Sequence, residues 1–204
     1  MNISNRTYGN KLFWINKRLF DIVICLLLIP LLFIVSIIVL FFNYFLNPGS
    51  LFFIQDRMGK GCSVFSAIKF RSMAPVKEIT RKYDDPIETT RITSFGKILR
   101  KSRIDELHQI INVLKGEMSL IGPRPDYYIH ALEYLKNVEG YRERHNIRPG
   151  ITGLSQIRLG YAEGLEATEK KASIDNYYIQ NVNYMIELKI IGNTIITIIR
   201  GMGK

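Results

Sequence analysis

Two adjacent carboxylates, Asp105 and Glu106, stand in the stretch of the chain best suited to chemistry, SRIDELHQIINVLKGEMSLIGPRPD from Ser102 to Asp126. Adjacent carboxylates can bind Mg²⁺ while a phosphate completes its coordination shell. An aspartate can also attack a phosphoryl group to form an acyl phosphate, or act as a general base for another nucleophile. The stretch therefore predicts phosphoryl transfer, with Asp105 and Glu106 as catalytic residues and metal ligands. Basic residues that could neutralise a phosphate bracket the pair: Arg100, Lys101, Arg103 and Arg124.

A structural interpretation of the same acids competes with the catalytic one. The residues from Ser102 to Asp105 match the S-x-x-D capping box, and acidic residues favour the first turn of a helix. Apolar residues at every third or fourth position predict a helix from Ile104 to Leu114, on which Asp105 would point away from the apolar face. In this interpretation the acids only cap a helix on a solvated face, and the arginines pair with them.

The GPRP loop that follows is rigid, because Pro123 and Pro125 fix φ on both sides of Arg124. A guanidinium held in this way suits bidentate contact with a phosphate. Other catalytic classes are not expected. The sequence has neither a P-loop nor a G-x-G-x-x-G motif, and its two cysteines and three histidines lack the spacing of a zinc site.

The chain has 204 residues and a net charge of +10, from 28 Lys and Arg against 18 Asp and Glu. That length suits one core with an appended element, and the charge predicts an anionic partner: phospholipid, phosphorylated substrate or nucleic acid. The rival to an enzyme is a non-enzymatic, membrane-anchored binder of anionic lipid or nucleic acid. We expect no nucleic acid partner, because no module that reads nucleic acid is found.

A long apolar stretch, Leu19 to Leu46, predicts a membrane anchor. It is too long for a signal peptide, and no small-residue cleavage site follows it. A single spanning helix is one interpretation. Pro30, however, interrupts the stretch and leaves halves of about 11 to 16 residues, too short to span a bilayer. Positive residues flank both ends, which favours two cytoplasmic ends. We therefore favour a re-entrant helix-break-helix over residues 17–48, with Pro30 at the break and residues 1–16 as a tail.

The remaining residues, 49–204, predict a small α/β domain that is mostly helical. SLFFIQDRMG and CSVFSAIKFRSM predict a β-hairpin. Residues 74–93 are polar and predict a loop. Besides the helix at 104–114, we expect helices over SFGKILRKS and at Asp126 to Arg144, Glu166 to Val182 and Met185 to Ile199, the last two being amphipathic C-terminal helices.

The motifs together resemble one family. KRLFDI before a proline-interrupted apolar stretch, then IQDRMG, IKFRSM, RIDELHQIINVLKGEMSLIGPRP and RPGITGLSQ, are similar to the bacterial sugar transferases. These are the monotopic phosphoglycosyl transferases that begin glycoconjugate assembly. The resemblance runs from about Lys17 to Ile199, nearly the whole chain. The larger members carry an additional N-terminal membrane domain that has no counterpart here, so the chain is expected to be close to a minimal catalytic unit.

The resemblance implies a reaction and its partners. A phosphosugar would pass from a UDP-sugar to polyprenyl (undecaprenyl) phosphate with release of UMP, through a covalent intermediate on Asp105. Glu106 would be the partner acid and Mg²⁺ the cofactor. The expected location is the bacterial inner membrane among phospholipids, with the catalytic domain facing the cytoplasm, and a homodimer is left open. Lys17, Arg18 and Asp21 match the motif at the membrane entry.

The predicted phosphate ligands come partly from the resemblance, in which Lys69, Arg100 and Arg124 match family positions. Two departures bear on the rest. Ile29 stands where many members have Ser before the proline, and IRLGYAEG follows Gln156 where many have NGR. Arg158 is then the candidate substitute for the arginine of NGR, from a shifted position. Two further arginines complete the predicted set: Arg71 and Arg148.

Overall fold

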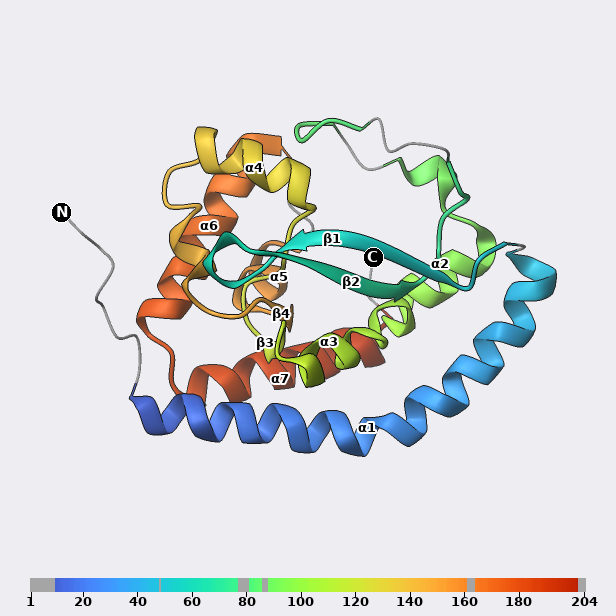
Figure 1. Ribbon diagram of the computed structural model, residues 1–204, viewed down its shortest axis with the longest axis horizontal. Helices are drawn as coiled ribbons and strands as arrows, with labels where there is room; N and C mark the ends of the chain where they lie inside the picture. Colours follow the sequence, from blue (N-terminus) through green and yellow to red (C-terminus); the bar gives the residue numbers. More distant parts are fainter. Residues whose placement is uncertain (1–9, 48, 77–80, 86–87, 161–163, 202–204) are drawn as a thin grey trace.

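The computed structural model describes residues 10–47, 49–76, 81–85, 88–160 and 164–201. It is mostly helical with two short sheets, which confirms the predicted helical class and the β-hairpin (Figure 1). In chain order the helices and strands are α1 (Lys11–Leu46), β1 (Phe52–Met58), β2 (Val64–Phe70), α2 (Ser94–Lys101), α3 (Gln109–Lys115), β3 (Ser119–Ile121), α4 (Tyr128–Asn137), β4 (Gly150–Thr152), α5 (Leu154–Leu159), α6 (Gly164–Gln180) and α7 (Tyr184–Ile199).

The N-terminal apolar segment is one helix rather than two. Figure 1 shows α1 running along one side of the molecule and bending near its middle, and Pro30 lies inside it. The predicted break is therefore corrected to a bend: proline removes a single backbone donor and distorts the preceding turn, and the hydrogen bonds on either side persist. The helix also begins at Lys11, six residues before the predicted boundary at 17, because Asn10 caps it by accepting from the Leu12 backbone N–H at 3.1 Å.

One stripe of α1 is buried along its whole length. Its buried residues recur at intervals of four or seven, which places them on one face of the helix. The other faces are apolar and exposed, and α1 is the one helix among the described residues long and apolar enough to cross a membrane. This is the character expected of a membrane-associated helix. The buried residues are Phe13, Lys17, Asp21, Cys25, Leu32, Val39 and Asn43.

The polar residues of the KRLFDI motif attach α1 to the domain. Arg18 donates to the last carbonyls of α3, those of Val113 at 2.7 Å and Leu114 at 3.1 Å. Asp21 accepts from the Ser119 hydroxyl at 2.7 Å, and the Lys17 ammonium lies 2.5 Å from Glu187 of α7. Because all three side chains bind protein groups, they fix the position of the helix.

The β-hairpin packs against α1 and also bears Lys69, one of the predicted phosphate ligands. β1 pairs antiparallel with β2, from Phe52 opposite Phe70 to Met58 opposite Val64. Phe65 and Ala67 of β2 belong to a core that includes Cys25 and Leu32 of α1. Lys69 lies on the same face of β2, two residues further along.

A parallel strand pair, which the sequence did not predict, joins the two proline-glycine loops. β3 pairs with β4, with Ser119 opposite Gly150. The Gly150 N–H donates to Pro123 O at 3.0 Å. A Cβ atom at Gly150 would lie 2.1 Å from the Gly122 nitrogen, so only glycine permits this approach. The GPRP loop is thereby held against the RPGITG loop.

The predicted helices are found, with two corrections. SFGKILRKS forms α2, and the two C-terminal helices are α6 and α7. The helix predicted at Asp126 to Arg144 is only α4, because the chain turns at Gly140, where φ is +71°. The helix predicted at Ile104 to Leu114 is a 3₁₀ turn, Ile104–Glu106, followed by α3. Residues 74–93 hold one 3₁₀ turn, Thr89–Arg91, in their described part, consistent with the predicted loop.

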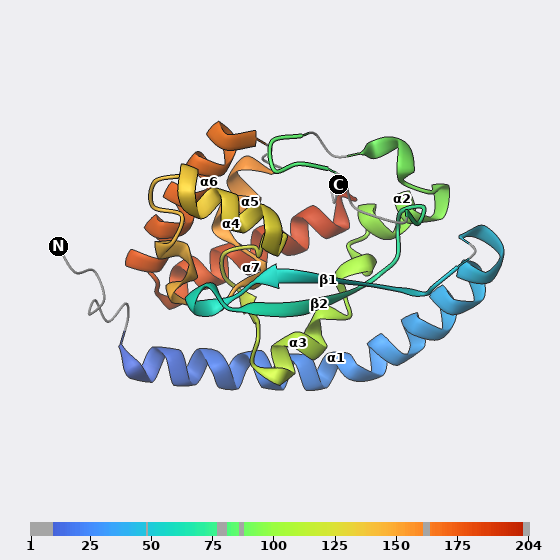
Figure 2. The ribbon, with the colours of Figure 1, turned by 45° about the horizontal axis from the view of Figure 1, so that its top comes forward.

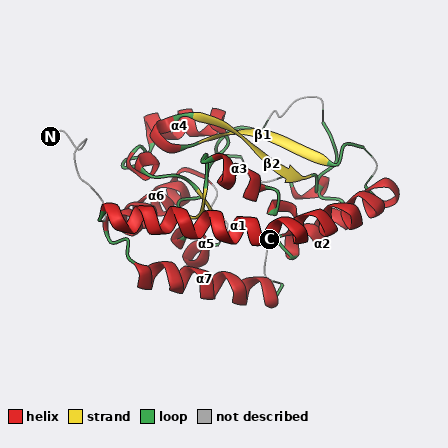
Figure 3. Ribbon diagram, turned by 60° about the horizontal axis from the view of Figure 1, so that its bottom comes forward, coloured by secondary structure: helices red, strands yellow, loops and turns green. Residues whose placement is uncertain are grey.

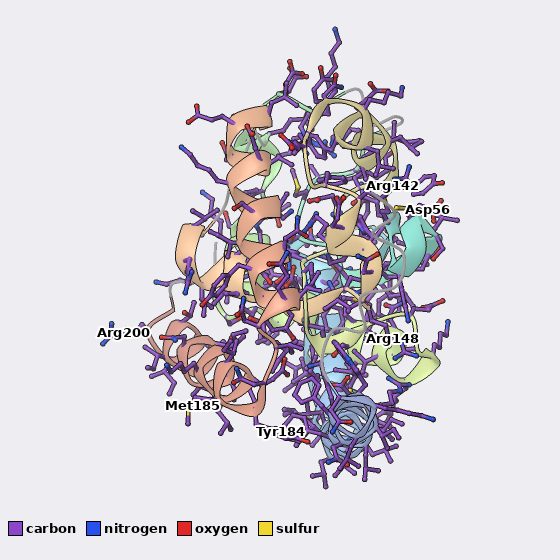
Figure 4. All side chains as sticks on the ribbon, turned by 90° about the vertical axis from the view of Figure 1, so that its left-hand side faces the viewer. Asp56, Arg142, Arg148, Tyr184, Met185 and Arg200 are labelled. Atoms are coloured by element: carbon purple, nitrogen blue, oxygen red, sulfur yellow. The ribbon has the colours of Figure 1, made fainter. Side chains whose placement is uncertain are left out.

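The start of helix α7 lies beside the start of α1, where the rings of Phe13 and Tyr184 are 5.0 Å apart. Figure 3 shows both helices on the side of the molecule away from α4, and Figure 2 shows α1 along the lower edge. In Figure 4, Tyr184 lies towards α1 and Met185 lies further from it. Several apolar side chains of α7 are exposed: Met185, Leu188, Ile195, Ile196, Ile198 and Ile199.

Candidate active site

A cavity of about 560 Å³ opens between the hairpin, the end of α2, the GPRP loop and the start of α5 and α6. It contains both predicted catalytic acids. The structure also brings four of the six predicted phosphate ligands to its wall: Lys69, Arg71, Arg100 and Arg124.

The acids sit at a sharp turn between two helices, and the capping interpretation is wrong. The Ser102 hydroxyl donates to Ile98 O at 2.9 Å and so closes α2 instead of capping the next helix. Arg103 then adopts a left-handed conformation with φ of +60°, uncommon for a residue with a Cβ. The following 3₁₀ turn buries both acids, with Asp105 only 8% and Glu106 only 4% exposed.

Glu106 is held as an anion by several cations. Arg124 donates to it through both Nη atoms, one of them 2.9 Å from Oε2, and the Lys69 ammonium lies 2.6 Å from Oε1. Arg103 is 3.7 Å from Oε2. Burial alone would raise the pKa of Glu106, but Arg124 and Lys69 outweigh it and hold that pKa well below its usual value.

Asp105 is the less satisfied acid. Its Oδ1 is buried and has no hydrogen-bond partner among the described residues. Burial, reinforced by the negative charge of Glu106, raises the pKa of Asp105 to about 6 against the opposing charges of Lys69, Arg100 and Arg124. A buried carboxylate oxygen without a partner, in a cavity lined by cations, can attack phosphorus or bind a metal ion.

Two basic side chains complete the cluster. Burial lowers the pKa of Lys69 to about 8, although Glu106 opposes the change. Arg100, near the end of α2, forms no side-chain hydrogen bond or ion pair with the described residues and lines the cavity. Its guanidinium is therefore available to an anion that enters.

A buried ionic network, which the sequence analysis missed, positions the GPRP loop. Arg144 is fully buried, donates to Arg124 O at 2.7 Å and lies 2.5 Å from Asp126 and 2.8 Å from Asp175. Lys171 of α6 pairs with Asp126 at 2.5 Å. Arg144 stands 20 residues after Arg124, inside a segment predicted as a helix, so no local pattern indicated the contact.

Three predicted phosphate ligands are engaged elsewhere: Arg71, although it lines the cavity, and Arg148 and Arg158, which do not. Arg71 donates to Ser50 O at 2.6 Å and to Asn47 O, and so joins β2 to the end of α1. Arg148 donates to Gly116 O at 2.7 Å and, like Arg158, is not among the residues that line the cavity. The Arg158 guanidinium lies over the Tyr177 ring, 5.6 Å from its centre. A phosphate role for these three arginines stays a prediction.

Of the two acids, Asp105 has an oxygen left free by the described residues to bind a magnesium ion, and Glu106 does not. The described residues contain no cluster of three or more His, Cys, Asp or Glu side chains that could hold a metal. Mg²⁺, however, commonly uses one or two carboxylates and takes its other ligands from substrate phosphates and water. The unpartnered Oδ1 of Asp105 could supply one ligand, whereas the Glu106 oxygens are already engaged by Lys69 and Arg124.

Comparison with known proteins finds a matching family and several similar chains. The family model described as bacterial sugar transferase matches residues 12–201. A UDP-N-acetylgalactosamine-undecaprenyl-phosphate N-acetylgalactosaminephosphotransferase from Aeromonas hydrophila is 39% identical over 187 residues, which cover 92% of this chain and 44% of the relative. A UDP-glucose:undecaprenyl-phosphate glucose-1-phosphate transferase from Klebsiella pneumoniae is 35% identical and covers 88% of this chain and 39% of its own length.

The chain thus spans about two fifths of the length of these two relatives. A third relative, an exopolysaccharide production protein from Rhizobium leguminosarum, is 34% identical over 92% of this chain and 97% of its own length. The family model matches residues 12–201, a range that includes the buried acids and the cations around them. The chain therefore belongs to the bacterial sugar transferase family.

Proposed function

We propose that this protein transfers a sugar phosphate from a UDP-sugar to polyprenyl (undecaprenyl) phosphate and releases UMP. The observation that carries the proposal is that Asp105 lines a cavity with Lys69, Arg100 and Arg124 while its buried Oδ1 has no partner among the described residues. Two of the relatives named above, those from Aeromonas hydrophila and Klebsiella pneumoniae, are named for a UDP-sugar and undecaprenyl phosphate, which supports the same substrates here.

In the first proposed step, the Asp105 carboxylate attacks the phosphorus that bears the sugar. The bond from that phosphorus to the oxygen bridging to UMP breaks, UMP leaves with the electron pair, and an aspartyl phosphosugar remains. In the second step, an oxygen of polyprenyl phosphate attacks the same phosphorus. The bond to Asp105 breaks, and the free carboxylate returns.

The cations supply the electrostatic part of catalysis. Lys69, Arg100 and Arg124 offset the charge that grows on the phosphate oxygens and on the leaving UMP. Glu106 keeps Lys69 and Arg124 in place, because it binds both side chains. A bound Mg²⁺ would supply further neutralisation of the phosphates. Asp105 would be a protein ligand through its unpartnered Oδ1, and Glu106 would become one only by giving up a contact with Lys69 or Arg124.

The apolar faces of α1 and α7 support a membrane location for the reaction. The two helices lie on the side of the molecule away from α4 (Figure 3), and both expose apolar side chains, which suits contact with a bilayer surface. We propose that α1 enters and leaves the cytoplasmic leaflet of the bacterial inner membrane, with the domain in the cytoplasm, where it begins assembly of a glycoconjugate.

The test is UMP release by the full chain in lipid nanodiscs, with undecaprenyl phosphate, Mg²⁺, and UDP-N-acetylgalactosamine or UDP-glucose. We expect release with the wild type and none with Asp105→Asn. Mass spectrometry after incubation with the UDP-sugar alone should show a phosphosugar adduct on Asp105. Turnover without an adduct, under rapid quenching, would instead support Asp105 as a general base. A near-normal rate in Asp105→Asn would refute both roles.

A further inference from the structure

One end of the active-site cavity is neutral. Lys69, Arg100 and Arg124 lie around the acids, whereas the start of α5 and α6 contributes uncharged residues to the lining. Lys171, the charged residue of this end, is neutralised by Asp126 at 2.5 Å. The neutral residues are Ser155, Gln156, Leu159, Gly160, Gly164 and Thr168.

Two polar atoms at this end lack a hydrogen-bond partner among the described residues, Ser155 Oγ and Gln156 Oε1. Ser155 is only 2% exposed. Buried polar atoms in folded proteins are nearly always paired, because an unpaired one loses its hydration without compensation. Thr168, in the same lining, follows that rule by donating to Gly164 O at 2.8 Å. Of the nine unpaired side-chain atoms among the described residues, four belong to residues that line the cavity, Arg91, Asp105, Ser155 and Gln156, and the last two are neighbours on α5.

The orientation of Gln156 shows which chemistry it offers. Its Nε2 lies 3.3 Å from Ile151 O, a contact that only the amide nitrogen can make favourably. The unpaired atom is then Oε1, which can only accept. Ser155 Oγ can both donate and accept. The pair requires a ligand group with at least one hydrogen-bond donor, which excludes a fully ionised phosphate.

We propose that Ser155 and Gln156 form a hydrogen-bonding subsite for an uncharged donor group of the UDP-sugar. Sugar hydroxyls, a sugar N-acetyl N–H and the N3–H of uracil all have this chemistry. The inference rests on the proposed function, because the phosphates of the same molecule would lie on the cations while its neutral part reaches α5. The backbone that carries the pair is fixed, since β4 immediately before it pairs with β3.

Steady-state kinetics of UMP release in nanodiscs test the subsite, with Ser155→Ala and Gln156→Met compared with the wild type. Each variant should raise KM for the UDP-sugar roughly three- to tenfold, as expected for one lost neutral hydrogen bond, while kcat changes less than about twofold. Ser173→Ala and Gln180→Met are matched controls, because both residues are exposed on α6 and make the same changes outside the cavity. They should leave KM unchanged.

Product inhibition by UMP identifies which part of the substrate binds. If the inhibition constant of UMP rises in parallel with KM, the pair contacts the nucleoside. If it is unchanged, the pair contacts the sugar. Either result supports the subsite. A KM within twofold of the wild type in both variants would overturn it. An inactive wild type would count against the proposed function instead.

Thermal unfolding without substrate separates a binding role from a structural one. Ser155→Ala removes a hydroxyl that has no partner in the described protein, so its Tm should equal or exceed that of the wild type. A Tm lower by several degrees, with KM unchanged, would show that the hydroxyl only stabilises the fold and would refute the proposal.

Discussion

Asp105 and Glu106 are neighbours in sequence, yet their surroundings shift their pKa values in opposite directions. Glu106 accepts from Lys69 and Arg124, and its pKa falls well below the usual range. Asp105 is buried with one oxygen unpaired, and its pKa rises to about 6. When the pKa values of two adjacent acids differ in this way, the two acids commonly serve different roles. Here Glu106 holds two cations in place, and Asp105 keeps one oxygen unpaired, as its proposed role as the nucleophile requires.

This difference predicts opposite effects on stability. Asp105→Asn removes a buried charge that has an unpaired oxygen, so the variant should be as stable as the wild type or more stable by on the order of 1 kcal/mol. Glu106→Gln leaves Lys69 and Arg124 without their counter-charge and should cost about 3 to 5 kcal/mol. Unfolding in detergent with EDTA present measures both. Equal losses in the two variants would contradict the division of roles.

Among the arginines, the structure distinguishes Arg100 from Arg158. Arg100 lines the cavity, and its side chain has no partner among the described residues, whereas Arg158 lies over Tyr177 outside it. A charge-assisted contact with phosphate is worth about 1.5 to 3 kcal/mol, so Arg100→Ala should lower kcat/KM roughly ten- to a hundredfold. Arg158→Ala should change it less than about twofold if the observed position persists during turnover.

Arg100→Lys should recover only part of the lost activity, because lysine lacks the planar fork. Kinetics with the preferred UDP-sugar decide between the two arginines. A large loss in Arg158→Ala would mean that its side chain leaves Tyr177 and enters the cavity, as the sequence comparison with NGR predicted.

At the scale of elements, α1 is attached to the domain at both ends. Arg18 and Asp21 bind α3 and the β3 segment near one end, and at the other end the Asn47 side chain donates to Arg71 O at 2.9 Å. A helix that spanned the bilayer would carry one end away from the domain. Attachment of both ends instead supports two cytoplasmic ends for α1.

Cysteine labelling tests that arrangement. Lys11→Cys and Ser50→Cys place single reporters at exposed positions beside the two ends of α1, in a Cys62→Ser background with Cys25 buried. A membrane-impermeant maleimide should label neither site in spheroplasts and both after lysis. Labelling of exactly one site from outside would identify a spanning helix and reject the re-entrant topology.

The sequence predicted helices and strands better than it predicted the turns and long-range contacts that connect them. Periodic apolar residues located α2, α6, α7 and the hairpin, because each buries one face locally. The turn at Arg103 and the parallel pair of β3 and β4 depend on partners far along the chain. The candidate acids Asp105 and Glu106 were chosen from their neighbours in sequence, and the structure places both at the cavity. Arg144, which holds the loop of Arg124, had no such signal.

At the scale of the whole molecule, the three histidines predict sensitivity to acid. His108, His130 and His145 are all buried, and burial lowers the pKa of each, that of His145 to about 3. The unfolded chain binds these protons near pH 6.5 and the folded chain does not. Stability should therefore fall as the pH drops below about 6.5. For His145 the fall should continue towards pH 3, by up to ~1.4 kcal/mol per pH unit.

The variant His145→Asn measures the share of one group. The asparagine cannot take up a proton, so the fall in Tm between pH 7 and pH 5 should be smaller than in the wild type. An identical fall in the two proteins would show that other groups, such as the carboxylates, account for the acid sensitivity.

The buried stripe of α1 has a practical consequence for anyone who wishes to work without detergent. Cys25 and Leu32 of this helix belong to the core shared with the hairpin and α3, and Val39 packs with Phe70 and Leu99. Deleting α1 from the chain would not give a soluble enzyme. The deletion would remove the α1 side chains from both hydrophobic clusters and expose the remaining apolar residues to water. Surface redesign of the outward face of α1, leaving the stripe untouched, is the route to a water-soluble form.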